Sequence, residues 1–363
     1  MSDWQGFAPL NDFTGPLREN LKRHPKRVVF AEGEDVRVLR VAQRLVEEQA
    51  CLPMLIGRKD VIRRMAEMNG LSLKLVRIIE PSKSSNLKMF CERYERAEQM
   101  LGFGTPINTV EIVSEPVHFA AMMVLYGQAD AVVAGNLKRV ASVFRAVSKY
   151  RQHPVPTKPL FAVSILVVEE FKRKFGGTGI YFLADTGVTA APTVENMAYY
   201  AVEVGKMARH MLGKPVRVSM LSASTNGSVP EVAADKTRAA TVLAQSVIAQ
   251  ECLNTDITVE GEIQIDAALS VDAYSVRVKP SSIRQPSDVW VYPTLDAADI
   301  SKKLICMMPS VQNYGLILGG LLIPVAQLPR LTDEDRIFGT TLVVANEAIK
   351  FHHLYPEGVA PAY

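Results

Sequence analysis

Short apolar runs typical of buried strands recur along the chain, separated by segments whose apolar residues have helical spacing. The strand-like runs are 28–31, 52–56, 76–79, 131–134, 161–168, 180–183, 216–221, 289–292 and 316–322. Helical spacing occurs at 36–49, 116–126, 188–212, 233–250 and 297–308. Strands that alternate with helices usually pair in parallel and are covered on both faces. The pattern therefore predicts an α/β fold with mostly parallel sheets.

The length and composition indicate a globular chain of two domains. A chain of 363 residues is too long for one small core, and the three prolines of Gln152-His-Pro-Val-Pro-Thr-Lys-Pro159 predict an extended hinge. Hydrophobic residues make up 48%, and the net charge is +3, so neither disorder nor nucleic-acid binding is indicated. The most apolar stretch, 314–328, is interrupted by glycines and a proline, which excludes a membrane span.

Several common catalytic and binding motifs are absent from the sequence. Four widely spaced cysteines and six histidines form no zinc pattern, and the amino terminus lacks a signal peptide, so a cytoplasmic protein without a metal is expected. No dinucleotide loop, P-loop or nucleophile elbow occurs. Phe175-Gly-Gly-Thr-Gly179 precedes a strand-like run rather than following one, and it predicts a turn.

A cluster of small polar residues follows the strand-like run that ends at Leu221. In open α/β sheets, ligands bind beyond the carboxyl ends of the strands, where short side chains and main-chain N–H groups converge. The segment MLSASTNGS would supply such groups to an anion, although an ordinary helix cap uses the same residue types. The candidates are Ser222, Ser224, Thr225, Asn226, Gly227 and Ser228.

Three further polar clusters also follow strand-like runs. They are Ala134-Gly-Asn136, Ala184-Asp-Thr-Gly187 and Val259-Glu-Gly-Glu-Ile-Gln-Ile-Asp266. In the last of these, the side chains of 260, 262, 264 and 266 share one face if the segment is extended, and that face either meets solvent or lines a cleft. Arg145 and Arg330 are either surface residues or anion ligands. The second alternative is considered because a guanidinium can form two parallel hydrogen bonds to phosphate.

Ordered segments of this chain resemble the phosphate acetyl/butyryl transferase family over nearly its whole length. The segments are Glu32-Gly-Glu-Asp-Val-Arg37, GQADAVVAGN ending at Asn136, Phe144-Arg145, LADTG at 183–187, MLSASTNGS, EGEIQIDAA at 260–268 and Pro293-Thr-Leu-Asp296. The resemblance implies two α/β/α three-layer domains like those of isocitrate and isopropylmalate dehydrogenases, with a cleft between them and a homodimer as the assembly. We assign the first domain to 1–155 plus 318–363 and the second to 156–317.

The resemblance also implies an activity, namely reversible transfer of an acetyl group between acetyl-CoA and inorganic phosphate, giving acetyl phosphate and coenzyme A. No metal or other cofactor takes part in the implied reaction. The catalytic residues so implied are Arg330, Arg145 and Asp335. The implied substrate-binding residues are Ser222, Ser224, Thr225, Asn226, Gly227, Ser228, Asn136, Asp185, Thr186, Gln264, Asp299 and Lys303.

The sequence departs from the family pattern at positions that the resemblance implies to be catalytic or to contact substrate. Gln327-Leu-Pro-Arg-Leu331 stands where the family usually has Asp-Leu-Ser-Arg-Gly, so Pro329 replaces a hydroxyl. Arg336 occupies the position of the family's aspartate base, and Asp335 is the nearest carboxylate. A second hypothesis follows, in which the chain is a catalytically silent acyl-CoA-binding module, because the segment RVVFAEGEDVRVLRVAQ is similar to the carboxyl-terminal domain of bacterial malic enzymes.

Overall fold

The computed structural model describes residues 12–100, 108–150, 159–230, 232–278 and 285–354. The chain divides into two compact units, a first unit of Leu17–Gln152 with Gly315–Tyr363 and a second unit of Met1–Pro16 with His153–Tyr314. The sequence assigned Phe13 to the first domain, but its ring packs on Phe182 and Tyr314 of the second unit, with centroids 6.5 and 5.8 Å away. The hinge expected at 152–159 lies, apart from Pro159, outside the described residues.

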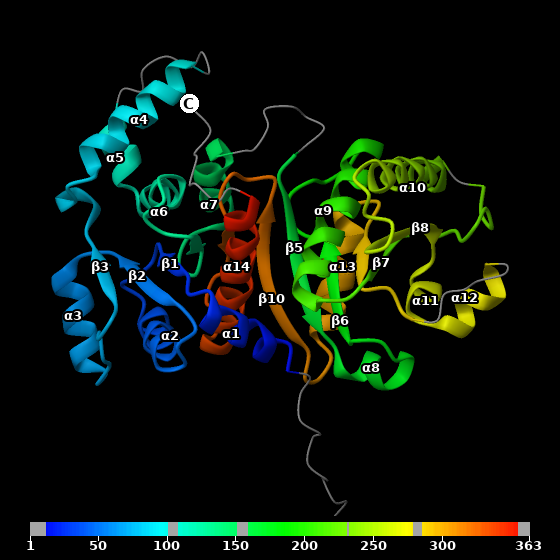
Figure 1. Cartoon of the computed structure of the whole chain (residues 1–363), viewed down its shortest axis with the longest axis horizontal. Coiled ribbons are helices and arrows are strands. Elements are labelled where there is room, and N and C mark those ends of the chain that lie inside the picture. Colours follow the sequence, from blue (N-terminus) through cyan, green and yellow to red (C-terminus); the bar gives the residue numbers. More distant parts are fainter. Residues whose placement is uncertain (1–11, 101–107, 151–158, 231, 279–284, 355–363) are drawn as a thin grey trace, which may run out of the picture. The chain divides into compact units, whose positions relative to one another are not determined.

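The first unit contains a mostly parallel sheet in the order β3-β2-β1-β4-β11-β10. Figure 1 labels β1, β2, β3 and β10 of this order. All neighbours for which a register is defined pair in parallel, except the antiparallel β10 and β11. Its strands are β1 (Arg27–Phe30), β2 (Leu52–Ile56), β3 (Arg77–Ile79), β4 (Ala131–Ala134), β11 (Val325–Gln327) and the part of β10 (Gln312–Gly319) from Gly315 onward.

Helices cover both faces of this sheet. The chain moves outward from β1 to β3 and then returns to β4 on the other side of β1, so right-handed crossovers place the two sets of helices on opposite faces. Helix α14 packs on α2, and α6 packs on β4. The helices are α1 (Thr14–Arg23), α2 (Val36–Glu47), α3 (Lys59–Met68), η1 (Pro81–Lys83), α4 (Leu87–Met100), α5 (Thr109–Ser114), α6 (Pro116–Leu125), α7 (Val140–Val147), η2 (Ser148–Tyr150) and α14 (Glu334–Leu354).

The second unit is also a layered α/β structure, with strand order β5-β6-β9-β7-β8. Only β5 runs antiparallel to its neighbour β6. Its strands are β5 (Phe161–Val167), β6 (Ile180–Ala184), β7 (Val216–Leu221), β8 (Ile257–Ile263) and β9 (Val289–Val291). Its helices are α8 (Glu169–Phe175), α9 (Val194–Leu212), α10 (Val232–Gln250), α11 (Ile265–Leu269), α12 (Val271–Arg277) and α13 (Leu295–Cys306).

Buried residues lie on both faces of the sheet of the second unit, one face covered by α9 and α10 and the other by α11 and α13. Helices α9 and α10 pack together and against β7 and β8. On the other side, the fully buried Trp290 stacks on Tyr181 at 4.6 Å, and Ala267 and Ala298 bring α11 and α13 into the same cluster. Each sheet is therefore covered by helices on both faces, which confirms the predicted α/β class with mostly parallel sheets.

A glycine turn confirms one prediction from the sequence, and a capped helix amino terminus corrects another. The turn predicted at 175–179 is confirmed, with Gly176, Gly177 and Gly179 all at positive φ. The helix expected at 188–212 begins only at Val194, because the Thr193 side chain caps it by accepting from the N–H of Asn196 at 3.2 Å. None of the described helices is long and apolar enough to cross a membrane.

Candidate active site

Three neighbouring strands of the first unit end at one edge of its sheet. The register pairs Phe30 of β1 with Val133 of β4, and Ala134 of β4 with Gln327 of β11. Since these strands are parallel, the segments that follow them emerge side by side. This edge therefore joins Glu32, the loop after Ala134 and the turn that carries Arg330, although Gly135 is 103 positions from Glu32 and Thr332 is 196 positions from Asn136.

The carboxylate of Glu32 organises the loop that follows β4. Its Oε2 accepts hydrogen bonds from the main-chain N–H groups of Gly135 (3.0 Å) and Asn136 (2.6 Å), and its Oε1 accepts from Leu137 (3.0 Å) and Lys138 (2.8 Å). Glu32 is only 8% exposed. Its negative charge thus occupies a concave set of N–H groups of the kind that elsewhere holds an external anion.

Asn136, predicted to bind substrate, is fully buried and has a protein partner at each end of its amide. Its Nδ2 donates to Asp35 Oδ2 at 2.7 Å, and its Oδ1 accepts from the Thr332 N–H at 3.0 Å. The relative exposure of Asn136 is 0%. In this structure the amide links the ends of β1, β4 and β11 instead of facing solvent.

Arg330 and Arg145 are the exposed cations of this unit that the sequence singled out. Arg330 lies on the turn after β11, and Arg145 lies in the last turn of α7. Neither guanidinium forms an ion pair with another described residue. Pro329, which replaces the family's serine, precedes Arg330, and its carbonyl accepts from the Thr332 hydroxyl at 2.6 Å.

Asp335 lies in the first turn of α14, with its side chain 92% exposed. Its Oδ1 is 2.7 Å from a guanidinium nitrogen of Arg44 on α2. Arg336, one residue further, extends a guanidinium nitrogen to within 3.4 Å of the Gly315 carbonyl. The carboxylate nearest in sequence to the family's base position is therefore accessible and ion-paired.

In the second unit, the hydroxyl-rich segment after β7 is folded around the carboxylate of Glu262. Glu262 Oε1 accepts from the Ser224 hydroxyl (2.8 Å), the Gly227 N–H (2.7 Å) and Arg238 (3.0 Å). Burial would raise the pKa of Glu262, but these three donors hold it below its ordinary value. The Ser224 hydroxyl and the Gly227 N–H are thus already engaged within the protein.

Thr225 and Gln264 hold each other on the same side of the loop. The Thr225 hydroxyl donates to Gln264 Oε1 at 3.2 Å and accepts from the Gln264 N–H at 2.9 Å. Ser222 is half-buried, and its hydroxyl accepts from the N–H of Ser224 at 3.2 Å. The reciprocal Thr225–Gln264 contact fixes the loop to the end of β8, whereas the Ser222 contact lies within the loop.

The tip of this loop faces solvent. Asn226, Gly227 and Ser228 are exposed, and Asn226 and Gly227 have φ values of +50° and +79°. That left-handed backbone suits glycine and asparagine, which explains their place here. The Ser228 hydroxyl accepts from the Thr225 N–H at 3.0 Å. The Ser228 hydroxyl also lies 3.4 Å from the Ser224 oxygen, and it is the donor there because the Ser224 proton goes to Glu262. The exposed polar groups at the tip are therefore the Asn226 amide and the Ser228 oxygen.

The turn after β6 is built on Asp185. Its carboxylate accepts from the N–H groups of Ala162 (2.8 Å), Gly187 (3.1 Å), Val188 (3.2 Å) and Thr189 (2.8 Å). Burial raises the pKa of Asp185 above its ordinary value, against the lowering effect of these bonds.

Thr186, the next residue, is buried at 2% exposure, and its hydroxyl bonds to Ser164 at 2.8 Å. Its carbonyl accepts from Lys302 Nζ at 3.2 Å. The side chain predicted to bind substrate is therefore turned into the unit.

Asp299 on α13 is flanked by two lysines. It lies 3.0 Å from Lys302 Nζ and 2.6 Å from Lys303 Nζ. Burial would raise the pKa of Asp299, whereas the two ammonium groups lower it below its ordinary value. Lys303 is the exposed member, with 71% of its side chain accessible. This pair gives the second unit an accessible cation suited to a phosphate oxygen.

The single polar face predicted over 260–266 is wrong for its last member. Strand β8 ends at Ile263 and α11 begins at Ile265, so Asp266 lies on a helix, where it pairs with Arg277 at 2.6 Å. The sequence also assigned no role to Glu32 or Glu262, although both stand in the recognised segments. Each of these carboxylates stands beside a glycine near the end of a strand, and this was the available signal.

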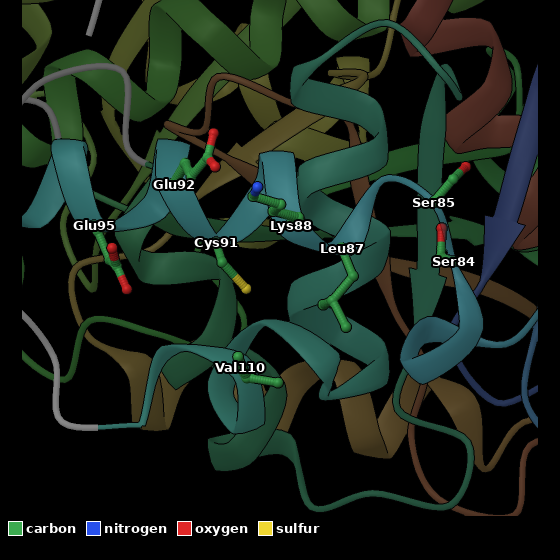
Figure 2. A pocket seen from close by; sticks show the side chains of 8 residues that line it. All are labelled: Ser84, Ser85, Leu87, Lys88, Cys91, Glu92, Glu95 and Val110. Carbon is green, nitrogen blue, oxygen red and sulfur yellow. The ribbon is translucent and has the colours of Figure 1, made fainter.

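The pocket in Figure 2, of about 500 Å³, lies elsewhere in the first unit, and no predicted site residue lines it. Leu87 and Cys91 point from α4 toward Val110 on α5. Burial raises the pKa of the Cys91 thiol, with a further contribution from Glu95 and Glu92. Among the described residues, no group of three or more histidines, cysteines or carboxylates is arranged to hold a metal ion.

The fold is that of an acyltransferase family. The chain belongs to the phosphate acetyl/butaryl transferase family, whose model matches residues 12–345. It is 31% identical over 332 residues to a phosphate acetyltransferase of Thermoanaerobacterium thermosaccharolyticum, covering 90% of this chain and 97% of that protein.

Two solved structures are similar to this chain along most of its length. A phosphotransacetylase from Streptococcus pyogenes has a TM-score of 0.83 at 26% identity, covering 94% of this chain and 100% of that one. The EutD phosphotransacetylase from Staphylococcus aureus has a TM-score of 0.83 at 23% identity, covering 93% and 98%. The latter likeness supports the fold.

Proposed function

We propose that this chain is a phosphate acetyltransferase, which transfers an acetyl group reversibly between acetyl-CoA and inorganic phosphate. The observation that carries the proposal is the family match over residues 12–345, together with a similar phosphate acetyltransferase aligned over 97% of its own length. The substrates are acetyl-CoA and phosphate in one direction, and acetyl phosphate and coenzyme A in the other.

The exposed arginines supply the charge that this reaction requires. Phosphate and a thioester must be brought together, and the carbonyl oxygen becomes negative in the transition state. We assign phosphate binding and charge stabilisation to Arg330, with Arg145 as a second cation. Arg330 stands on a turn whose neighbouring residues are hydrogen-bonded on both sides, which favours a fixed position for its guanidinium.

We propose Asp335 as the general base that takes the proton from the coenzyme A thiol. It is the accessible carboxylate five residues beyond Arg330, and its Oδ1 lies 2.7 Å from a guanidinium nitrogen of Arg44. On the second unit, the proposal assigns substrate contacts to the exposed Asn226 and Ser228 and to Lys303. Neither a metal nor a resident cofactor enters the proposed reaction, so a chelator should leave the rate unchanged.

The activity test mixes the purified full chain with acetyl phosphate and coenzyme A and follows thioester formation by its ultraviolet absorbance. We expect turnover, and we expect Arg330→Ala to lower kcat by about 10²–10³-fold, the usual loss when one transition-state donor is removed. Arg173→Ala, on the exposed helix α8, is the matched control. Binding of acetyl-CoA without turnover at any phosphate concentration would replace the proposal with the silent module.

Asparagine in place of Asp335 tests the proposed general base. Asp335→Asn should lower the rate of thioester formation by about 10²-fold or more, because general base catalysis contributes about 10²–10⁴-fold. Arg44→Ala removes the same ion pair but leaves the carboxylate in place, so we expect it to retain activity. Equal rates for wild type and Asp335→Asn would assign the proton transfer to another group.

We further propose that the enzyme is a cytoplasmic homodimer. The family resemblance motivates the dimer, and the four free cysteines fit a reducing compartment. Light scattering coupled to size-exclusion chromatography tests the assembly, and a monomer mass at micromolar concentration would refute it.

A further inference from the structure

We propose that Asn136 is a positioning residue, which acts on the reaction by holding the turn of Arg330 rather than by touching substrate. The inference rests on the proposed function and assigns a different role to a residue that the sequence predicted to bind substrate. It applies to the first unit alone, where β1, β4 and β11 end side by side.

The turn of Arg330 is fixed on both sides by residues 134–136. Before Arg330, the Leu328 N–H donates to the Ala134 carbonyl at 2.7 Å. After it, the Leu331 N–H donates to the Asn136 carbonyl at 3.0 Å. These two bonds lie on either side of Arg330, so the loop after β4 sets the geometry of the turn.

The side chain of Asn136 adds a third connection and anchors it to β1. Its Oδ1 accepts from the Thr332 N–H at 3.0 Å, while its Nδ2 donates to Asp35 at 2.7 Å. Asp35 is itself held by Arg37, whose guanidinium reaches the Thr332 carbonyl at 3.2 Å. The amide thus stands in a closed network that surrounds the turn, and its 0% exposure leaves no atom for a ligand.

Glu32 and Gly135 keep the loop of Asn136 in place. Glu32 accepts four consecutive main-chain N–H groups of residues 135–138, including that of Asn136. Gly135 has a φ of +108°, and a Cβ there would lie 2.5 Å from the Leu328 carbonyl oxygen. That close approach brings the loop against the turn of Arg330 and admits no larger residue.

Arg330 itself depends on this support, because no described side chain pairs with its guanidinium. An exposed arginine on a loose turn samples many positions, and a displacement of about 1 Å can cost about 10²-fold in rate. The network therefore contributes to catalysis through the position of the Arg330 main chain. Removing the Asn136 amide should lower turnover only while Arg330 is present.

The test is a double-mutant cycle with Asn136→Ala and Arg330→Ala in the full chain, assayed for thioester formation from acetyl phosphate and coenzyme A. We expect Asn136→Ala alone to lower kcat/KM by about 10²-fold. In the Arg330→Ala background, the same change should lower kcat/KM by less than about twofold relative to Arg330→Ala alone. Asn346→Ala is the matched control, since its amide is equally buried, at 1% exposure, but bonds to Leu17 and Leu342 carbonyls. It should keep the wild-type kcat.

A milder pair of variants keeps the proposal falsifiable if Asn136→Ala does not fold. Thr332→Val removes the single hydroxyl that donates to the Pro329 carbonyl, and Thr332→Ser restores it. We expect kcat to fall about tenfold in the valine variant and to recover in the serine variant, with the loss again absent in Arg330→Ala. Losses that multiply with that of Arg330→Ala would overturn the inference, because they would show that Asn136 acts independently of Arg330. A wild type without turnover would instead refute the proposed function.

Discussion

Replacing Glu32 with glutamine should destabilise the protein by several kcal/mol, although the change adds no bulk. Each carboxylate oxygen of Glu32 accepts two main-chain N–H groups, from Gly135 and Asn136 on one side and Leu137 and Lys138 on the other. A glutamine amide keeps one acceptor oxygen and turns an NH₂ group toward two N–H donors. Two charge-assisted bonds are then lost in a buried place.

The expected loss follows from the value of such bonds. At about 1.5–3 kcal/mol for each hydrogen bond to a charged group, the loss is about 3–6 kcal/mol. A change of 1 kcal/mol shifts the melting temperature of a domain of about 150–250 residues by about 2–4 °C, so the shift should reach about 10 °C. Urea denaturation followed by circular dichroism measures the free energy of unfolding, and calorimetry measures the melting temperature.

A control variant distinguishes the loss of the Glu32 hydrogen bonds from the effect of a glutamate-to-glutamine change in general. Glu19→Gln makes the same change at a surface residue, whose side chain is 58% exposed and pairs with Lys22. We expect its denaturation midpoint to equal that of the wild type. If Glu32→Gln costs less than about 1 kcal/mol, the net worth of one ordinary hydrogen bond, the four-bond account of the loop is refuted.

Two further predictions concern the second unit. The pKa of Glu262 is lower in the folded state than its ordinary value of 4.5, so its ionised form stabilises the protein above pH 4.5, and this stability is lost as the pH falls through the folded pKa. Glu262→Gln should therefore flatten the decline in unfolding free energy below pH 4.5. An unchanged acid profile would contradict this prediction. Lys303→Ala should raise the KM for coenzyme A several-fold at low salt and less at high salt, with kcat unchanged, because the exposed ammonium acts as a screened point charge. An unaltered KM at both ionic strengths would remove Lys303 from the binding site, and Lys22→Ala, on α1, is the matched control.

Much of the architecture was predictable, because the alternation of apolar runs is a local signal. The strands predicted at 52–56, 131–134 and 216–221 match β2, β4 and β7 residue for residue. Helix α14 was missed because residues 337–349 are buried on all sides, which removes the one-sided apolar pattern that marks a surface helix. Helices that alternate polar and apolar faces, such as α2, gave the clear signal.

The candidate site was predictable as a set of segments but not as a set of roles. The sequence located the polar segments after β4, β6 and β7, since each follows an apolar run, and it named Arg330 without predicting β11. It treated the hydroxyls of Ser224 and Thr225 as available donors, whereas both donate within the protein, to Glu262 and Gln264. A hydroxyl has one proton to donate, and composition does not reveal where that proton goes.

The sequence by itself determined the α/β class, the membership of an acyltransferase family and the loops in which polar residues gather. These depend on spacing and on residue type, which are properties of short segments. Only the tertiary structure decided which polar groups face solvent and which hold the loops. The contacts concerned join residues 38 positions apart for Ser224 with Glu262, and 196 apart for Thr332 with Asn136. Folding brings such partners within hydrogen-bond distance, and each bond made inside the protein removes a group from the surface that substrates meet.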